Sequence, residues 1–231
     1  MSAEDQKKAA AEEAVKHINA GNKVGLGTGS TANYFIAALA RRAKEGLDVT
    51  CVPTSQASRT LAESLGLKMS SLDETPYLDI TVDGADEFDS EFRLIKGGGG
   101  AMHREKLVAS SSQFVVVIAD QSKQVKTLGK FPLPVEVSRF GVKATAWKME
   151  RAFAYLGLSA KMAVRVRDGK PFITESGNPI IDCSLGSIPD PEKVEGYLNN
   201  IPGVIETGLF IGICGIIYVA GPKGVTELKR A

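Results

Sequence analysis

The stretch DGADEFDSEFRLIKGGGGAMHRE, residues 83–105, decides how this chain is organised. It opens with Asp83 and Asp86, directly after an apolar segment, and leads through Lys96 into a run of glycines before it ends at Glu105. Carboxylates, one cation and bare backbone N–H groups are what proton transfer on an anionic sugar requires. We therefore interpret the rest of the chain as the scaffold that holds and covers a site built from this stretch.

Composition is typical of a globular protein that binds neither nucleic acid nor membranes. Hydrophobic residues make up 43% of the 231 positions and the formal net charge is +1; the first value favours a packed core, and the second argues against a nucleic-acid or anionic-membrane surface. The charged N-terminus lacks the apolar core of a signal peptide, and no apolar run reaches the ~20 residues of a membrane span. We expect a cytoplasmic protein.

Cysteine and histidine usage argues against a metal site. The three cysteines are scattered without CxxC spacing, and there are two histidines. This predicts neither a zinc site nor a disulfide framework, and it fits a reducing cytosol. We expect no metal, although an all-carboxylate magnesium site stays open.

A second glycine-rich stretch, GTGST at 27–31, separates a short expected strand from an expected helix. In this arrangement backbone N–H groups and the positive end of the helix face an anion, which predicts phosphate binding. The alternative is a tight turn in which Ser30 only caps the helix. The GxGxG spacing lacks the third glycine of a dinucleotide fingerprint and the P-loop lysine, and so favours a small phosphorylated ligand.

Strands expected to alternate with helices predict an α/β fold with a Rossmann-like, mainly parallel sheet and helices on both faces. The expected strands are 24–26, 49–52, 78–82 and 114–119. Ligands gather at the carboxyl ends of such strands, where GTGST and DGAD both fall. Each motif has a plainer alternative, because Asp-Gly forms turns and a glycine run can be a linker. The three carboxylates of DGADE, crowded within five residues, favour a functional site.

After Gly129 the pattern changes to that of a second, smaller domain. FPLPVEV, 131–137, has two prolines and is expected to be an edge-like strand. The elements that follow complete the order β-α-β-β-α-β, which predicts a ferredoxin-like α+β unit. We expect a Rossmann-like catalytic domain, a ferredoxin-like lid domain and a return of the chain to the first sheet, at 1–130, 131–206 and 207–231.

Three lysines are further candidates for binding an anion. Lys123 follows the strand 114–119, and Lys7 and Lys8 lie in the first turns of a helix that a capping box at Ser2 should start. Each either reaches the ligand or is an ordinary exposed lysine. We count Lys123 and Lys7 among the candidate binding residues.

The motifs together resemble one family. GLGTGST, TVDGADE, IKGGGGAMHREK, ADQSKQV, LGKFPLPVEV and IPGVIETGLF resemble the ribose-5-phosphate isomerase A family nearly end to end. The resemblance implies reversible aldose–ketose isomerisation of D-ribose 5-phosphate to D-ribulose 5-phosphate, in the non-oxidative pentose phosphate pathway, without a cofactor and in a homodimer or homotetramer. It implies Glu105 as the catalytic base. The ligand-binding positions it implies are Thr28, Gly29, Ser30, Thr31, Asp83, Gly84, Ala85, Asp86, Lys96, Gly97, Gly98, Gly99 and Lys123. Gly100 stands where many relatives have alanine, and we expect little consequence.

The residue types suit that chemistry. One base, Glu105, must carry a proton between C2 and C1 through an enediol, while Lys96 and the glycine amides stabilise the charge on the carbonyl oxygen. We hypothesise that Asp83 and Asp86 hold hydroxyls and that one of them assists ring opening. Two other classes stay open: coenzyme A transfer with Glu105 as nucleophile, and a sugar-phosphate sensor that binds without turnover.

Overall fold

The computed structural model describes residues 1–230, which divide into two compact units. The first consists of Met1–Ala85, Arg104–Gln124 and the segment from Ile213 onward, and the second of Asp86–His103 and Val125–Gly212. The second unit thus contains 86–103, which the sequence analysis placed in the first domain. Long-range contacts explain this assignment, because Glu87 accepts hydrogen bonds from the amides of Gly129 and Phe131.

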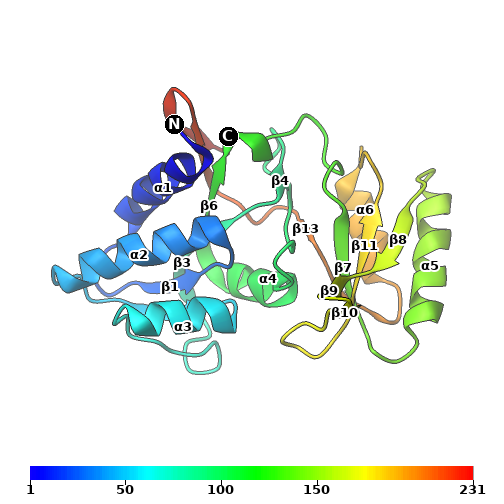
Figure 1. Cartoon of the computed structure of the whole chain (residues 1–231), viewed down its shortest axis with the longest axis horizontal. Coiled ribbons are helices and arrows are strands. Elements are labelled where there is room, and N and C mark those ends of the chain that lie inside the picture. The colour runs from blue at the N-terminus through cyan, green and yellow to red at the C-terminus, as the bar shows by residue number, and fades with distance from the viewer. Residues whose placement is uncertain (231) are drawn as a thin grey trace. The chain divides into compact units, whose positions relative to one another are not determined.

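The first unit is built on a six-stranded sheet in the order β15-β14-β6-β3-β1-β2 (Figure 1). All neighbouring strands are parallel except β14 and β15, so the prediction of a mainly parallel sheet to which the chain returns is confirmed. The strands are β1 (Lys23–Leu26), β2 (Thr50–Pro53), β3 (Leu78–Gly84), β6 (Ser112–Asp120), β14 (Ile216–Gly221) and β15 (Gly224–Lys229).

Helices cover both faces of this sheet, as predicted. Apolar residues of α1 and α2 form one core with Val24 and Ile80, whereas Val108 of α4 packs beside Gly25 and Thr81 on the opposite face. The capping box that starts α1 is present between Ser2 and Asp5. The helices are α1 (Ala3–Ala14), η1 (Val15–His17), α2 (Ser30–Lys44), α3 (Gln56–Ser64), α4 (Met102–Ser110) and η2 (Gln121–Lys123).

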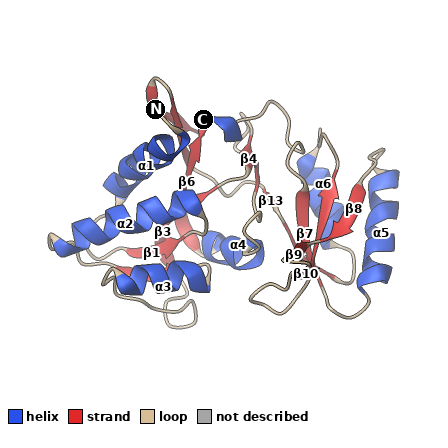
Figure 2. Cartoon of the chain, in the orientation of Figure 1, coloured by secondary structure: helices blue, strands red, loops and turns tan. Residues whose placement is uncertain are grey.

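The second unit has the predicted ferredoxin-like arrangement, with α5 and α6 packed on one antiparallel sheet (Figure 2). Its sheet order, β12-β7-β11-β8, is that of a split β-α-β unit. The elements are β7 (Leu133–Val137), α5 (Val142–Tyr155), β8 (Lys161–Val164), β11 (Ile180–Ser184), α6 (Pro191–Asn199) and β12 (Val204–Thr207). Short strands accompany them: β4 (Glu87–Phe88), β5 (Leu94–Ile95), β9 (Val166–Arg167), β10 (Lys170–Pro171) and β13 (Leu209–Phe210).

The expectation that 131–137 forms an edge-like strand was wrong. β7 lies between β12 and β11, and every one of its residues is buried. Pro134 is tolerated there because of the side to which its nitrogen points. The N–H and C=O of one strand residue point to the same side, and the Pro134 carbonyl accepts from the amide of Gly208. Its missing donor therefore faces the chain beyond Thr207, the last paired residue of β12.

Neither the cysteines nor the metal-ligating residue types of residues 1–230 indicate a further site. All three cysteines are buried and free, and burial raises the pKa of Cys51 to about 12. Within residues 1–230, no group of three or more His, Cys, Asp or Glu side chains is placed to hold a metal ion. In the same described part of the chain, none of the helices has the length and apolar character needed to span a membrane.

Candidate active site

The two predicted motifs of the first unit meet at the point where its strand order reverses. β1 has β2 on one side and β3 on the other, and in doubly wound sheets such a switch point is where ligands bind, outside the carboxyl ends of the strands. GTGST follows β1 and DGAD ends β3. The amide of Gly27 donates to the carbonyl of Val82 at 2.9 Å, so pairing of the two strands continues into the motifs.

Asp83 is held in place by backbone groups at this switch point. Its side chain is 3% exposed, and its Oδ1 accepts from the amides of Thr28, at 3.1 Å, and Gly84, at 2.7 Å. The carboxylate occupies the space that a side chain at position 27 would need, since a Cβ on Gly27 would lie 2.1 Å from Oδ1. The backbone path at Gly27 of GTGST and the position of the Asp83 carboxylate of DGAD therefore depend on each other.

The start of α2 offers backbone amides to an anion. The residue that caps this helix is Gly29, at φ +109°, and no side chain caps the first turn. The alternative in which Ser30 caps α2 was wrong, because Ser30 is the first residue of the helix. Gly29 and Ser30 are exposed.

A cluster of hydroxyls beside Thr28 was not predicted from the sequence. Thr28 Oγ1 lies 2.7 Å from Thr54 Oγ1 and 2.8 Å from Ser55 Oγ, and Ser58 Oγ donates to the carbonyl of Gly27 at 2.6 Å. Ser55 caps α3 and accepts from the amide of Ser58. Thr54 donates to the carbonyl of Leu26 and ties the end of β1 to α3.

Glu105 lies in the first turn of α4 and is 4% exposed. Three residues further along the same helix, Val108 packs beside Gly25 of β1. Few water molecules reach a buried carboxylate, so a proton that it accepts from a substrate exchanges little with solvent. This suits a general base that must return the proton.

In the second unit, the glycine run is an ordered turn and not a linker. Gly97 has φ +107°, and the amide of Gly100 donates to its carbonyl at 3.0 Å. The amide of Gly98 donates to Asp86 Oδ2 at 2.7 Å. Lys96 is 4% exposed, its amide bonds to the Gly208 carbonyl at 2.8 Å, and its Nζ lies 5.5 Å from the Phe210 ring centroid.

Gly100 matters more than expected. It has φ +88°, and a Cβ there would lie 2.4 Å from the ring of Phe172. Alanine at this position would have to displace that ring and adopt a backbone conformation that side chains disfavour. The expectation of little consequence therefore does not hold for this chain.

The candidate lysines differ in their surroundings. Lys7 is paired with Glu4 at 2.9 Å and its side chain is 18% exposed. Hydrogen bonds from Tyr34, and then from Lys7, lower the pKa of Glu4. Lys8 is exposed. Lys123 is half-buried and ends η2, directly after β6, which is the neighbour of β3.

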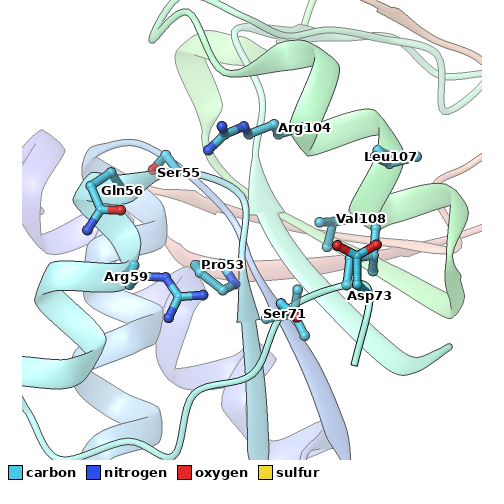
Figure 3. Close-up of a pocket in the computed structure, with 11 residues that line it drawn as sticks. Pro53, Ser55, Gln56, Arg59, Ser71, Asp73, Arg104, Leu107 and Val108 are labelled. Atoms are coloured by element: carbon cyan, nitrogen blue, oxygen red, sulfur yellow. The ribbon is translucent and has the colours of Figure 1, made fainter. Parts of the chain in front are cut away.

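The first unit also contains a cavity that includes none of the predicted site residues (Figure 3). Its volume is about 360 Å³, and Arg59, Asp73 and Arg104 contribute its charges. Arg59 already bonds to Glu63 and to the carbonyl of Ser70. The cavity adjoins the switch point through Ser55, whose Oγ lies 2.8 Å from Thr28 Oγ1, and no motif in the sequence indicated it.

Comparison with known proteins identifies the family. The family model for ribose 5-phosphate isomerase A (phosphoriboisomerase A) matches residues 50–224. A ribose-5-phosphate isomerase A from Parvibaculum lavamentivorans is 54% identical over 230 residues, covering 99% of this chain and 100% of the relative. The chain belongs to the ribose-5-phosphate isomerase A family. A member from Brucella suis is 49% identical, with 96% of each chain covered.

Solved structures of the ribose-5-phosphate isomerase A family have the same fold. The enzyme from Methanocaldococcus jannaschii matches with a TM-score of 0.89 and 41% identity, covering 99% of this chain and 100% of that one. A D-ribose-5-phosphate isomerase in complex with phospho-erythronic acid matches with a TM-score of 0.91 and 39% identity, covering 100% of both chains. The predicted α/β fold class is therefore confirmed.

Proposed function

We propose that this chain is a ribose-5-phosphate isomerase that interconverts D-ribose 5-phosphate and D-ribulose 5-phosphate. The observation that carries the proposal is the match, along nearly the whole chain, to proteins of that name. This aldose–ketose isomerisation is an intramolecular oxidoreduction and a step of the pentose phosphate pathway. The buried carboxylates Asp83 and Glu105 and the amide-rich turn at 27–31 supply groups that such a reaction uses.

The phosphate is assigned to GTGST and the start of α2. Helix N-termini attract anions because their first N–H groups are unsatisfied and the helix dipole is positive there. The amides and hydroxyls of Ser30 and Thr31 are the proposed donors, and Lys7 and Lys123 are the proposed cations. Lys7 would have to exchange its contact with Glu4 for the phosphate.

The proton transfer is assigned to Glu105. As the carboxylate, it removes the proton from C2 of the open-chain aldose and returns it to C1 of the enediol. A second proton passes from the C2 hydroxyl to the C1 oxygen, so that the atoms balance without a cofactor. Lys96 and the amide of Gly99 are proposed to stabilise the developing oxyanion, because the amide of Gly98 already donates to Asp86. Asp83 and Asp86 are proposed to hold substrate hydroxyls, and the fixed geometry of Asp83 suits a positioning role.

A coupled assay of ribulose 5-phosphate formation tests the proposal, with the isomerisation run in EDTA without metal or cofactor and stopped before the coupling enzymes are added. We expect substrate-saturable turnover with kcat within the ~1–10³ s⁻¹ of typical enzymes. Transfer of coenzyme A from an acyl-CoA donor would favour the rival with Glu105 as nucleophile. Binding of ribose 5-phosphate without turnover would favour a sensor, and activity lost in EDTA but restored by Mg²⁺ would contradict the metal-free mechanism.

We also propose that the protein is a cytoplasmic homodimer or homotetramer. Support comes from the second unit, where Phe140 is 93%, Trp147 57% and Tyr155 73% exposed on or beside α5. Exposed aromatic side chains grouped on one helix are typical of a surface that another chain covers. Sedimentation velocity should give a mass of two or four chains, and a single species near 24.5 kDa would contradict the proposal.

A further inference from the structure

We infer that Arg165 is a positioning residue for this isomerisation, because it holds the carbonyl side of the glycine turn and thereby fixes the turn's amides and Asp86. The inference rests on the proposed function for its catalytic readout. Its structural part, the contact of Arg165 with the carbonyls of the glycine turn, is independent of the substrate.

The backbone and the guanidinium of Arg165 are held by partners other than the glycine turn. Its amide donates to the carbonyl of Ile180 and its carbonyl accepts from the amide of Phe172, both at 2.8 Å. Its Nε and Nη2 face the carboxylate of Asp182 at 2.9 and 2.5 Å. Such a two-point contact fixes the guanidinium plane, and the side chain is only 12% exposed.

The remaining nitrogen of Arg165 faces the glycine turn. Nη1 donates to the carbonyl of Gly97 at 2.7 Å and lies 3.3 Å from that of Gly98. Because a trans peptide is planar, with C=O and N–H pointing in opposite directions, fixing a carbonyl also fixes the amide that follows it. The Gly97 carbonyl therefore sets the Gly98 amide, which donates to Asp86 Oδ2. The Gly98 carbonyl sets the amide of Gly99.

Glycines need such an external hold. They have the greatest backbone freedom of any residue, so a turn of consecutive glycines is ordered only by its partners. Here the partners lie on opposite sides, with Arg165 on the carbonyls and Asp86 on an amide. Arg165 is thereby connected to a proposed substrate-binding carboxylate through a single peptide plane.

The test is Arg165→Lys, which keeps the charge but cannot hold Asp182 at two points and reach the turn together. We expect kcat to fall roughly 10- to 100-fold, the effect of losing a charge-assisted hydrogen bond, with a much smaller change in KM. Phospho-erythronic acid carries a carboxylate in place of the reacting carbons of the sugar, so we expect its affinity to fall with kcat. Inhibition by inorganic phosphate should stay unchanged, because we assign the phosphate to GTGST and the start of α2 and not to the glycine turn.

Two further variants separate positioning from charge and from folding. Arg165→Met should lose at least as much activity, while Lys161→Met, an equal loss of charge at an exposed position on β8, should behave as wild type. If Arg165→Lys does not fold, Asp182→Asn replaces it, because it weakens the two-point contact and keeps the guanidinium.

The chemical shift of the Gly98 amide in NMR spectra reports how that amide is positioned, and it requires no turnover. We expect it to shift in Arg165→Lys and not in Lys161→Met. An unshifted Gly98 resonance, or unchanged kcat and phospho-erythronic acid affinity, would overturn the inference. An inactive wild type would contradict the proposed function and leave the Gly98 result to decide the structural part.

Discussion

Glu105→Gln should lower kcat at least ~100-fold and leave KM little changed, because the amide cannot accept the proton that moves between C2 and C1. The substitution preserves the size and polarity of a side chain that is 4% exposed in the first turn of α4. Ground-state binding, which we assign to the phosphate and hydroxyl contacts, should persist. Steady-state kinetics in the coupled assay measure both constants.

The matched control is Glu136→Gln, a second buried carboxylate, 1% exposed. Its Oε1 accepts from Thr174 and Asn178. Glutamine can keep an oxygen there, but a neutral amide accepts more weakly than a carboxylate, at a cost of about 1–2 kcal/mol of unfolding free energy. We expect this variant to melt earlier with kcat close to wild type. If Glu105→Gln turned over normally, Glu105 would be removed from the mechanism; equal rate losses in both variants would point to a general effect of disturbing buried carboxylates.

Periodicity and glycines were enough to predict the parallel sheet, the helices on its two faces and the ferredoxin-like order of the second unit. The apolar strands before GTGST and DGAD and the helical spacing after them are local signals, and the structure places them as expected. β4, β5 and β13 carry no such signal, since each has two residues and exists only because Ile95 pairs with Leu209 and Glu87. The edge prediction for β7 failed for the same reason: the position of Pro134 in the ladder depends on where β12 ends.

The residues of the candidate site also divide into those that local motifs predicted and those that only the tertiary fold brings together. Asp83 and the glycines were visible as motifs, because their chemistry is local. Arg165 reaches Gly97 across 68 positions of sequence, from the single residue between β8 and β9. Ser55 and Ser58 meet Thr28 only because α3 packs beside the end of β1. Contacts of this kind depend on the tertiary fold and leave no mark in the sequence near either partner.

Gly27→Ala should damage both stability and activity, because two backbones approach each other at this position. An added Cβ would lie 2.1 Å from Asp83 Oδ1 and 2.6 Å from Asp83 Cα, and the second atom cannot rotate away. Gly27 itself is held on both sides, by the Val82 carbonyl and by Ser58 Oγ. β1 and β3 would therefore have to separate at their carboxyl ends.

We expect this overpacking to cost ~1–3 kcal/mol or more of unfolding free energy, read from chemical denaturation. Moving Asp83 by about 1 Å should lower kcat/KM by about 100-fold, since misplacement of that size disturbs a fixed site strongly. The control is Gly196→Ala in α6, where a Cβ meets nothing within 4 Å. There alanine should be neutral or stabilise by ~1 kcal/mol, as in any helix interior. Wild-type stability and kcat/KM in Gly27→Ala would show that Asp83 does not depend on the shape of GTGST; a stability loss without a loss of activity would remove Asp83 from the site.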